Sequence, residues 1–311
     1  MNKNGKSRLR HIIIGNTGHM GLLKGVVLYT LLIGIGFIYL YPMLYMFVNS
    51  LMSPEDLTDP TVTWLPTQLY FDNFVKAFNT LDFLNSFWNS VYITVISTLL
   101  QTSSVAVTAY ALARFELPVK KLWIALILLT FIVPVETMLV PRYVLLNNYG
   151  LLDTPLAFWL NAVFGQGLKS AVFILVFFQI FRSYPISIDE AAEIDGAGRY
   201  KIFGVIALPI ARSGIVLSIL FSFVWYWNET RQSGLYFGSV IKTLPMKLGS
   251  FAASYSSLYE DSAGVENTAR SINESITLAG TLLSVLPIII MYVILQNQFV
   301  ESIEKSGITG E

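Results

Sequence analysis

Six apolar segments dominate the sequence, and polar residues are concentrated in the stretches between them. A transmembrane helix needs roughly 20 consecutive, mostly apolar residues to cross the hydrocarbon core of a bilayer. The six predicted spans run from Val26 to about Val48, from about Phe87 to Ala113, from Leu122 to Val140, from about Phe158 to Phe181, from Ile210 to Asn228 and from Ile276 to Gln296. The pattern therefore predicts an all-α, polytopic membrane protein with about six transmembrane helices.

Ionisable residues interrupt two of the predicted spans. Glu136 follows Pro134 near the end of the third span, and Lys169 lies within the fourth. Charged side chains at membrane depth are costly and usually face protein or water, so both positions are candidates for function. Glu136 could equally be an interfacial carboxylate at a broken helix end. Lys169 could line a water-filled vestibule, or extend its ammonium group toward the membrane surface.

The distribution of basic residues predicts the orientation of the chain. Short cytoplasmic segments of membrane proteins carry an excess of Lys and Arg. An N-terminus in the cytoplasm places most basic residues there, namely Lys3, Lys6, Arg8, Arg10, Lys24, Arg114, Lys120, Lys121, Arg182, Arg199, Lys201 and Arg212. We therefore expect a cytoplasmic N-terminal segment (residues 1–25), a transmembrane domain (26–300) and a cytoplasmic C-terminal tail (301–311).

Two longer stretches, Met52 to Leu84 and the loop of residues 229–275, are predicted to lie outside the cell. The second carries four basic residues, Arg231, Lys242, Lys247 and Arg270, against the general trend. Longer loops cross the membrane largely regardless of their charge, so the predicted orientation stands.

Composition excludes several classes of function. Hydrophobic residues make up 54% of the 311 positions and charged residues only 13%, whereas soluble domains carry about a quarter charged residues. The 20 basic and 20 acidic residues cancel, which argues against a nucleic-acid surface. The sequence has no cysteine, and both histidines, His11 and His19, lie in the polar N-terminal stretch. Thiolate chemistry and histidine-dependent catalysis within the membrane are therefore excluded.

The most informative polar segment lies at residues 184–209, in the predicted cytoplasmic connection between the fourth and fifth spans. Ser187 is a good N-cap, with Glu190 three residues later completing a capping box, and Gly196 and Gly198 can end the helix. Asp189 in the first turn suits the helix dipole. A helix of two to three turns is not stable alone in water, so it should pack against a partner.

This segment resembles the coupling loop of ABC importer permeases. Glu190-Ala191-Ala192, then Gly196, then Ile206-x-Leu208-Pro209 reproduces the family pattern E-A-A-x₃-G-x₉-I-x-L-P at every fixed position. The resemblance implies that the helix docks on a cytoplasmic ATPase subunit. The residues implied in that contact are Glu190, Ala191, Ala192, Asp195 and Gly196. Without the resemblance, the segment could equally be a capped interfacial helix.

Further stretches are similar to the shorter, six-helix permease subunit of maltose-type carbohydrate importers. They include Tyr110 to Phe115, Trp227-Asn228, Thr63 to Pro66, Gly150 to Thr154 and Thr243 to Pro245. The resemblance implies the type I ABC importer permease fold, in a prokaryotic cell membrane with both termini cytoplasmic. The chain departs from the family pattern in a longer loop at 229–275 and in its C-terminal tail.

Candidate residues of the translocation path combine aromatic faces with polar groups, as sugar binding requires. They are Asn161, Lys169, Trp225, Trp227 and Asn228. The alternative is that the aromatic residues form an interfacial belt or pack within the protein.

The predicted function is that of a pore-forming subunit of an ATP-driven, solute-binding-protein-dependent sugar importer. The sequence has no phosphate-binding loop, so we expect no catalytic residue, metal or cofactor in this chain, and ATP with magnesium on separate subunits. The implied partners are a second permease subunit, two ATPase subunits and an extracytoplasmic solute-binding protein. Alternatives are the same machine with a polyol or glycerol phosphate as cargo, or an ion-coupled secondary transporter.

Overall fold

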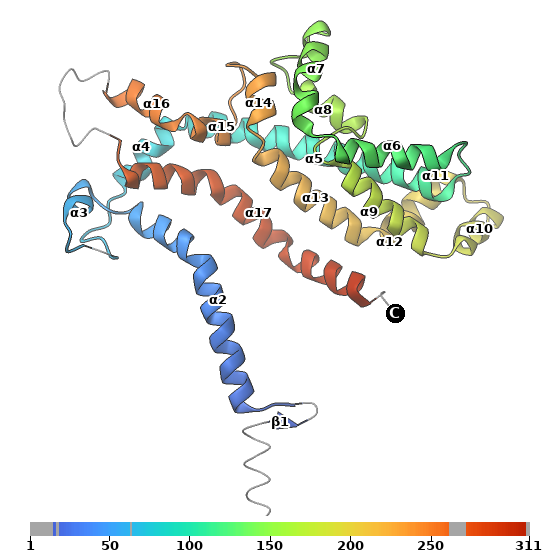
Figure 1. The fold of residues 1–311 in the computed structure, drawn as a ribbon, viewed down its shortest axis with the longest axis horizontal. Helices are drawn as coiled ribbons and strands as arrows, with labels where there is room; N and C mark the ends of the chain where they lie inside the picture. The colour runs from blue at the N-terminus through green and yellow to red at the C-terminus, as the bar shows by residue number, and fades with distance from the viewer. Residues whose placement is uncertain (1–14, 17–18, 63, 261–271, 309–311) are drawn as a thin grey trace, which may run out of the picture. The chain divides into compact units, whose positions relative to one another are not determined.

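The computed structural model describes residues 15–16, 19–62, 64–260 and 272–308 of the chain (Figure 1). Apart from the short antiparallel pair β1 (Gly15–Asn16) and β2 (His19–Met20), the described elements are helices. This confirms the predicted all-α fold. The basic residues Lys3 to Arg10, together with His11, Thr63, Arg270 and positions 309–311 of the tail, lie outside the described residues.

The chain divides into two compact units, one formed by residues 1–76 and 272–282, the other by 77–271 and 283–311. In the first, α2 (Leu22–Asn49) is apolar around its whole circumference and mostly exposed, as expected of a helix surrounded by lipid. It is followed by α3 (Pro54–Thr58) and α4 (Asp72–Thr80). Ser53 and Asp56 cap α3 reciprocally, and the Asp56 carboxylate also accepts a hydrogen bond of 2.6 Å from the Thr67 hydroxyl.

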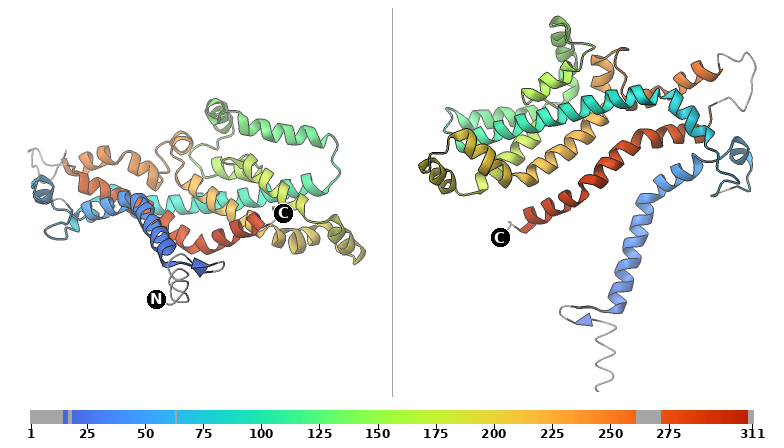
Figure 2. Two further views of the ribbon diagram at one scale, coloured as in Figure 1. Left: turned by 60° about the horizontal axis from the view of Figure 1, so that its bottom comes forward. Right: turned by 180° about the vertical axis from the view of Figure 1, so that it is seen from behind.

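The second unit is built around α5 (Phe83–Arg114), a helix of 32 residues. It packs against α8 (Leu156–Val163), α9 (Ser170–Ser183), α13 (Arg212–Trp227) and α15 (Leu244–Gly249). Figure 2 shows α9 and α13 lying along it. One stripe of α5 is polar yet buried, and all its residues except Gln101 are small, which lets neighbouring helices approach closely in membranes. Its members are Ser86, Ser90, Thr94, Ser97, Thr98, Gln101 and Thr102.

The remaining helices of this unit are short and connect the long ones. Their bounds are α6 (Lys120–Ile132), α7 (Val135–Asn148), α10 (Ile186–Ile194), α11 (Arg199–Ile202), η1 (Phe203–Ala207), α12 (Leu208–Ile210), α14 (Arg231–Tyr236), α16 (Phe251–Tyr255) and η2 (Ser256–Glu260). The long helix α17 (Glu274–Ile308) belongs to the first unit up to Leu282 and to the second from Leu283. Within the unit, α10 and α15 lie toward opposite ends of α5 (Figure 1).

Three helices are long and apolar enough to cross a membrane alone, namely α2, α5 and residues 274–298 of α17. They correspond to the first, second and sixth predicted spans. Three bent helix pairs raise the number of candidate spans in the described chain to as many as six. The third predicted span is the pair α6 and α7, which bends by 99° where Pro134 precedes α7, so that α7 leaves the bundle steeply (Figure 1).

The prediction of one continuous fourth span from Phe158 to Phe181 is wrong. The chain forms α8 and α9 instead, separated by a turn in which Gly165 and Lys169 have positive φ angles of 68° and 52°. Such angles favour glycine and end the helix. The fifth span begins at Arg212, because the helix before it bends by 77° at Ala211.

Candidate functional site

The predicted short helix at residues 184–209 exists as α10. Pro185 precedes its first residue, and the helix ends at Ile194. Gly196 follows with φ +82°, and the Ala197 N–H donates a 2.9 Å hydrogen bond to the Ala192 carbonyl. Glycine in this left-handed conformation is the common way to end a helix, so the predicted stop at Gly196 is confirmed.

The predicted N-cap and capping box are wrong. Ser187 lies inside the first turn, the residue at the N-cap is Pro185, and no side chain caps the helix. The fixed φ of proline suits a helix start, and the N–H of Ile188 reaches the Pro185 carbonyl at 3.3 Å. The acidic side chain that matters here is Asp189 in the first turn, which is buried and faces Tyr184 and Arg114.

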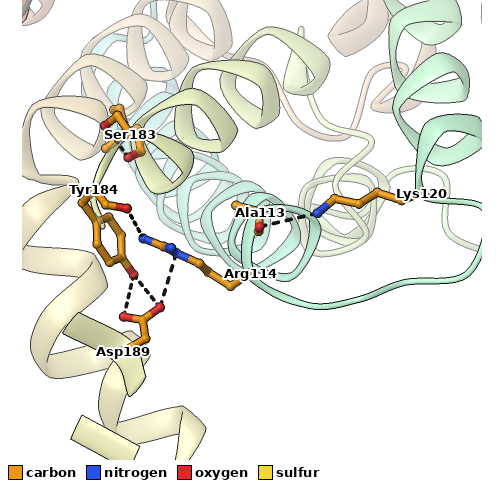
Figure 3. A network of polar contacts seen from close by, with 7 residues as sticks. Ala113, Arg114, Lys120, Ser183, Tyr184 and Asp189 are labelled. Carbon is orange, nitrogen blue, oxygen red and sulfur yellow. Dashed lines mark hydrogen bonds and ion pairs between the residues drawn. The ribbon is translucent and has the colours of Figure 1, made fainter. Parts of the chain in front are cut away.

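Asp189 ties α10 to the end of α5 through two other residues (Figure 3). The Tyr184 hydroxyl lies 3.0 and 3.2 Å from the two Asp189 carboxylate oxygens and donates to them. Arg114 Nη2 donates to the Tyr184 carbonyl at 2.9 Å, and its guanidinium carbon lies 3.5 Å from the centre of the Tyr184 ring. We call Arg114, Tyr184 and Asp189 the α5–α10 joint.

The charges in this joint are nearly enclosed. Arg114 Nε lies 3.3 Å from Asp189 Oδ2, and the two side chains are 8% and 12% exposed. Nε is not aligned for a hydrogen bond, so this contact is a charge pair, while the hydrogen bonds run through Tyr184. Burial raises the pKa of the Tyr184 hydroxyl, and the Asp189 charge raises it further against the opposing effect of Arg114. The hydroxyl therefore stays protonated and remains a donor.

The opposite face of α10 is open. Glu190, Ala191, Asp195 and Gly196 are exposed, and Ala192 is half-buried. Two large apolar side chains stand out beside them, because Ile194 is 86% exposed and Tyr200 is 95% exposed. Four of the five residues singled out from the sequence are thus exposed. Sequence reasoning missed the partners of Asp189, since Arg114 is 70 positions away from Tyr184 along the chain.

A second polar network fixes the turn between α8 and α9. Gln101 of α5 donates to the Leu168 carbonyl at 2.8 Å and to the Ser222 hydroxyl at 3.1 Å. The Tyr226 hydroxyl of α13 donates to Gln101 Oε1 at 2.6 Å. Gly167 sits against both groups, and a β-carbon there would collide with Gln101 and Tyr226. This network was not predicted, because neutral Gln and Tyr side chains carry no distinctive pattern.

The candidate path residues fall into two groups. Lys169 and Trp225 are brought together, with the ammonium nitrogen 4.4 Å from the centre of the indole ring. The other three, Asn161, Trp227 and Asn228, form hydrogen bonds to backbone carbonyls of this chain. Trp227 is 1% exposed and donates to the Ser284 carbonyl at 3.3 Å, while the Asn161 and Asn228 amides bond to carbonyls one turn earlier in their helices. In this conformation Trp227 is a packing residue.

Glu136 does not lie in the interior of the described chain. Its carboxylate pairs with Arg231 of α14 at 3.1 Å, and the two side chains are 59% and 73% exposed. Within the described residues, no group of three or more His, Asp or Glu side chains is placed to hold a metal ion.

Known proteins resemble the chain over most of its length. The osmoprotective compounds uptake permease protein GgtD of Synechocystis sp. is 30% identical over 224 residues, which cover 69% of this chain and 73% of GgtD. The lactose transport system permease protein LacG of Rhizobium radiobacter is 27% identical over 280 residues, 90% of this chain and 94% of LacG. No protein-family model matches the sequence.

A solved structure shows the same fold. A chain of a bacterial ABC transporter involved in the import of the acidic polysaccharide alginate superposes with a TM-score of 0.72 at 22% sequence identity, covering 91% of this chain and 100% of that one. The predicted permease fold is thereby confirmed. From the identity with GgtD and the length of these matches, the chain belongs to the permease family of ABC importers.

Proposed function

We propose that the chain forms half of the translocation pore of an ATP-driven importer that takes up carbohydrate delivered by an external solute-binding protein. Support for a carbohydrate cargo comes from relatives such as LacG, named for lactose transport. The other half of the pore is a second, homologous permease subunit. Two ATPase subunits, which bind ATP and magnesium, complete the machine on the cytoplasmic side, where both termini of this chain lie.

The exposed face of α10 is the docking surface for the ATPase. One observation carries this assignment: the motif residues Glu190, Ala191, Asp195 and Gly196 are all accessible on a short helix whose opposite side is anchored by buried contacts. Small Ala191 and Gly196 permit close approach, Glu190 offers a charge to a basic partner, and Ile194 offers apolar surface to bury.

Coupling in this arrangement is mechanical. When the ATPase subunits close on ATP, they move α10, and the α5–α10 joint passes that movement to the C-terminal end of α5. The bends at Pro134 and Ala211 divide the neighbouring spans into shorter rigid segments, which can tilt separately. Alternating access of the pore then follows from ATP binding, and cargo is released as the nucleotide state changes.

The experiment is reconstitution of the purified complex in proteoliposomes with its binding protein. Glu190→Lys should abolish cargo-stimulated ATPase activity while the complex still inserts and assembles. Glu116→Lys is a matched control, because Glu116 is an exposed carboxylate just beyond the same end of α5 but outside α10. Full coupling in Glu190→Lys would refute the docking surface, and uptake by this chain alone without ATP would instead favour an ion-coupled secondary transporter.

A further inference from the structure

The turn between α8 and α9 lies near the middle of the membrane. Gln101, which holds this turn through the Leu168 carbonyl, is 18 residues from Phe83 and 13 from Arg114 in α5 (101 − 83 and 114 − 101). At about 1.5 Å per residue, these separations are about 27 and 20 Å from the two ends of the helix. The hydrocarbon core is about 30 Å thick, so the turn is deep within it.

Lys169 is therefore a lysine at the depth of the hydrocarbon core. It follows Leu168 directly, its side chain is exposed, and no carboxylate in the described part of the chain forms an ion pair with it. The Trp225 ring lies beside it, with the ring centre 4.4 Å from the ammonium nitrogen. A charge in this position is expensive against lipid, so the side chain must face water or a partner protein.

The surroundings of Lys169 suit a sugar that carries a negative charge. Trp225 is half-buried and stands in a row of aromatic rings, 5.3 Å from Phe173 and 5.7 Å from Phe221 between ring centres, which offers a flat face to a sugar ring. The positive end of the dipole of α9 begins at Ser170. The buried Ser170 hydroxyl has no hydrogen-bond partner among the described residues. The Lys169 ammonium group, the start of α9 and the unpartnered Ser170 hydroxyl all favour an anionic ligand.

We propose that Lys169 and Trp225 form a cargo subsite that binds an acidic sugar during its passage, with the carboxylate or phosphate of the cargo on Lys169 and the sugar ring on Trp225. The subsite rests on the proposed import function and names the class of its cargo. The subsite is exposed in the single chain, and the second permease subunit covers its exposed side in the assembled pore. Direct contact between this subunit and the cargo follows.

The test uses the full complex with its binding protein in proteoliposomes, and a panel of neutral and acidic sugars: maltose, lactose and galactobiose against digalacturonate and glucose 1-phosphate. Uptake should be confined to acidic members. Lys169→Met, which keeps the length of the side chain but removes its charge, should lower uptake of the acidic cargo about 10- to 100-fold, the range expected for one charge-assisted hydrogen bond. Lys169→Arg should restore most of it.

A matched control is Lys121→Met, which removes a lysine at the start of α6 and should leave uptake unchanged. Uptake of neutral sugars only, or undiminished acidic uptake by Lys169→Met, would overturn the subsite while leaving the import function intact. Failure of Lys169→Met to assemble with the second permease would overturn it too, because the lysine would then be pairing with that subunit. ATP-independent uptake by the wild type would refute the import function itself, and the subsite with it.

Discussion

Among the described residues of the second unit, two arginine–carboxylate pairs have almost the same separation. Arg114 and Asp189 approach to 3.3 Å, and Arg231 and Glu136 to 3.1 Å. The first pair is 8% and 12% exposed, and the second 73% and 59%. The distance alone therefore says little about what each pair does. Burial determines how strongly the two charges of each pair interact, because water screens the exposed charges and is kept away from the enclosed ones.

The contacts around each pair differ in the same direction. Asp189 also accepts from the Tyr184 hydroxyl, and Arg114 also donates to the Tyr184 backbone and stacks on its ring. Arg231 and Glu136 have only their single contact in the hydrogen-bond network of the described residues. Burying two charges is costly unless further hydrogen bonds satisfy them, so the additional contacts are what allow the α5–α10 joint to be buried. A buried pair that is held by additional contacts fixes one geometry.

The largest effect should come from breaking the buried pair. Asp189→Ala leaves the Arg114 guanidinium enclosed without its counter-charge, which costs about 3–5 kcal/mol in buried pairs of this kind. We expect α10 to detach from α5, so that hydrogen exchange of the α10 amides increases strongly and cargo-stimulated ATPase activity is lost.

A matched control for this variant is Asp195→Ala. It removes an exposed carboxylate from the same loop, where Asp195 follows the last residue of α10. Exchange in α10 should stay at the wild-type level in this variant. If Asp189→Ala and Asp195→Ala gave equal exchange, the joint would not be what holds α10.

A smaller effect should follow from disturbing the neutral network around Gln101 and Tyr226 in the middle of the membrane. These side chains are buried but uncharged, so the variant tests the effect of burial without charge. In Gly167→Ala the new methyl group meets the Gln101 amide and the Tyr226 hydroxyl, so both must shift. Overpacking of this kind costs about 1–3 kcal/mol. We expect a lower melting temperature of the purified complex with cargo-stimulated ATPase activity still present.

The control for this position is Gly204→Ala, because a β-carbon at Gly204 meets nothing within 4 Å. It should leave the melting temperature unchanged. Loss of coupling in Gly167→Ala without loss of thermal stability would mean that the turn itself, rather than the α5–α10 joint, transmits movement.

The membrane spans could be predicted because their signal is local. The apolar runs that became α2, α5 and α17 are long and uninterrupted, and each forms one helix long and apolar enough to cross a membrane. Pro134 likewise marked the bend between α6 and α7 in the sequence. The turn that splits the fourth span could not be found this way, since Gln101 holds it from 67 positions away.

The candidate site, like the spans, could be predicted only in part. The family resemblance at Glu190, Ala191 and Gly196 implied a docking helix, and that role stays a prediction. The helix stop at Gly196 follows from backbone geometry alone and is confirmed by its positive φ angle. The capping prediction failed because α10 begins at Ile186 after Pro185, so that Ser187 lies inside the first turn rather than at the N-cap. The contacts of Asp189 with Tyr184 and Arg114 were not predicted either. Trp227 was assigned to the path by its chemistry, but its burial against Ser284 depends on the packing of α17. For the partners of Asp189 and for Trp227, tertiary contacts between distant segments were the missing information.

The smallest effect should come from the exposed pair. Glu136→Gln keeps the size of the side chain and removes the charge, and solvent-exposed ion pairs contribute about 0–1 kcal/mol. We expect the melting temperature of the complex, its uptake rate and its cargo-stimulated ATPase activity to stay close to the wild type. Raising the salt concentration should likewise change little, because water already screens the two charges. A marked fall in uptake without a fall in stability would show that Glu136 contacts the binding protein or the cargo at the pore mouth, and exposure would then no longer separate the two pairs.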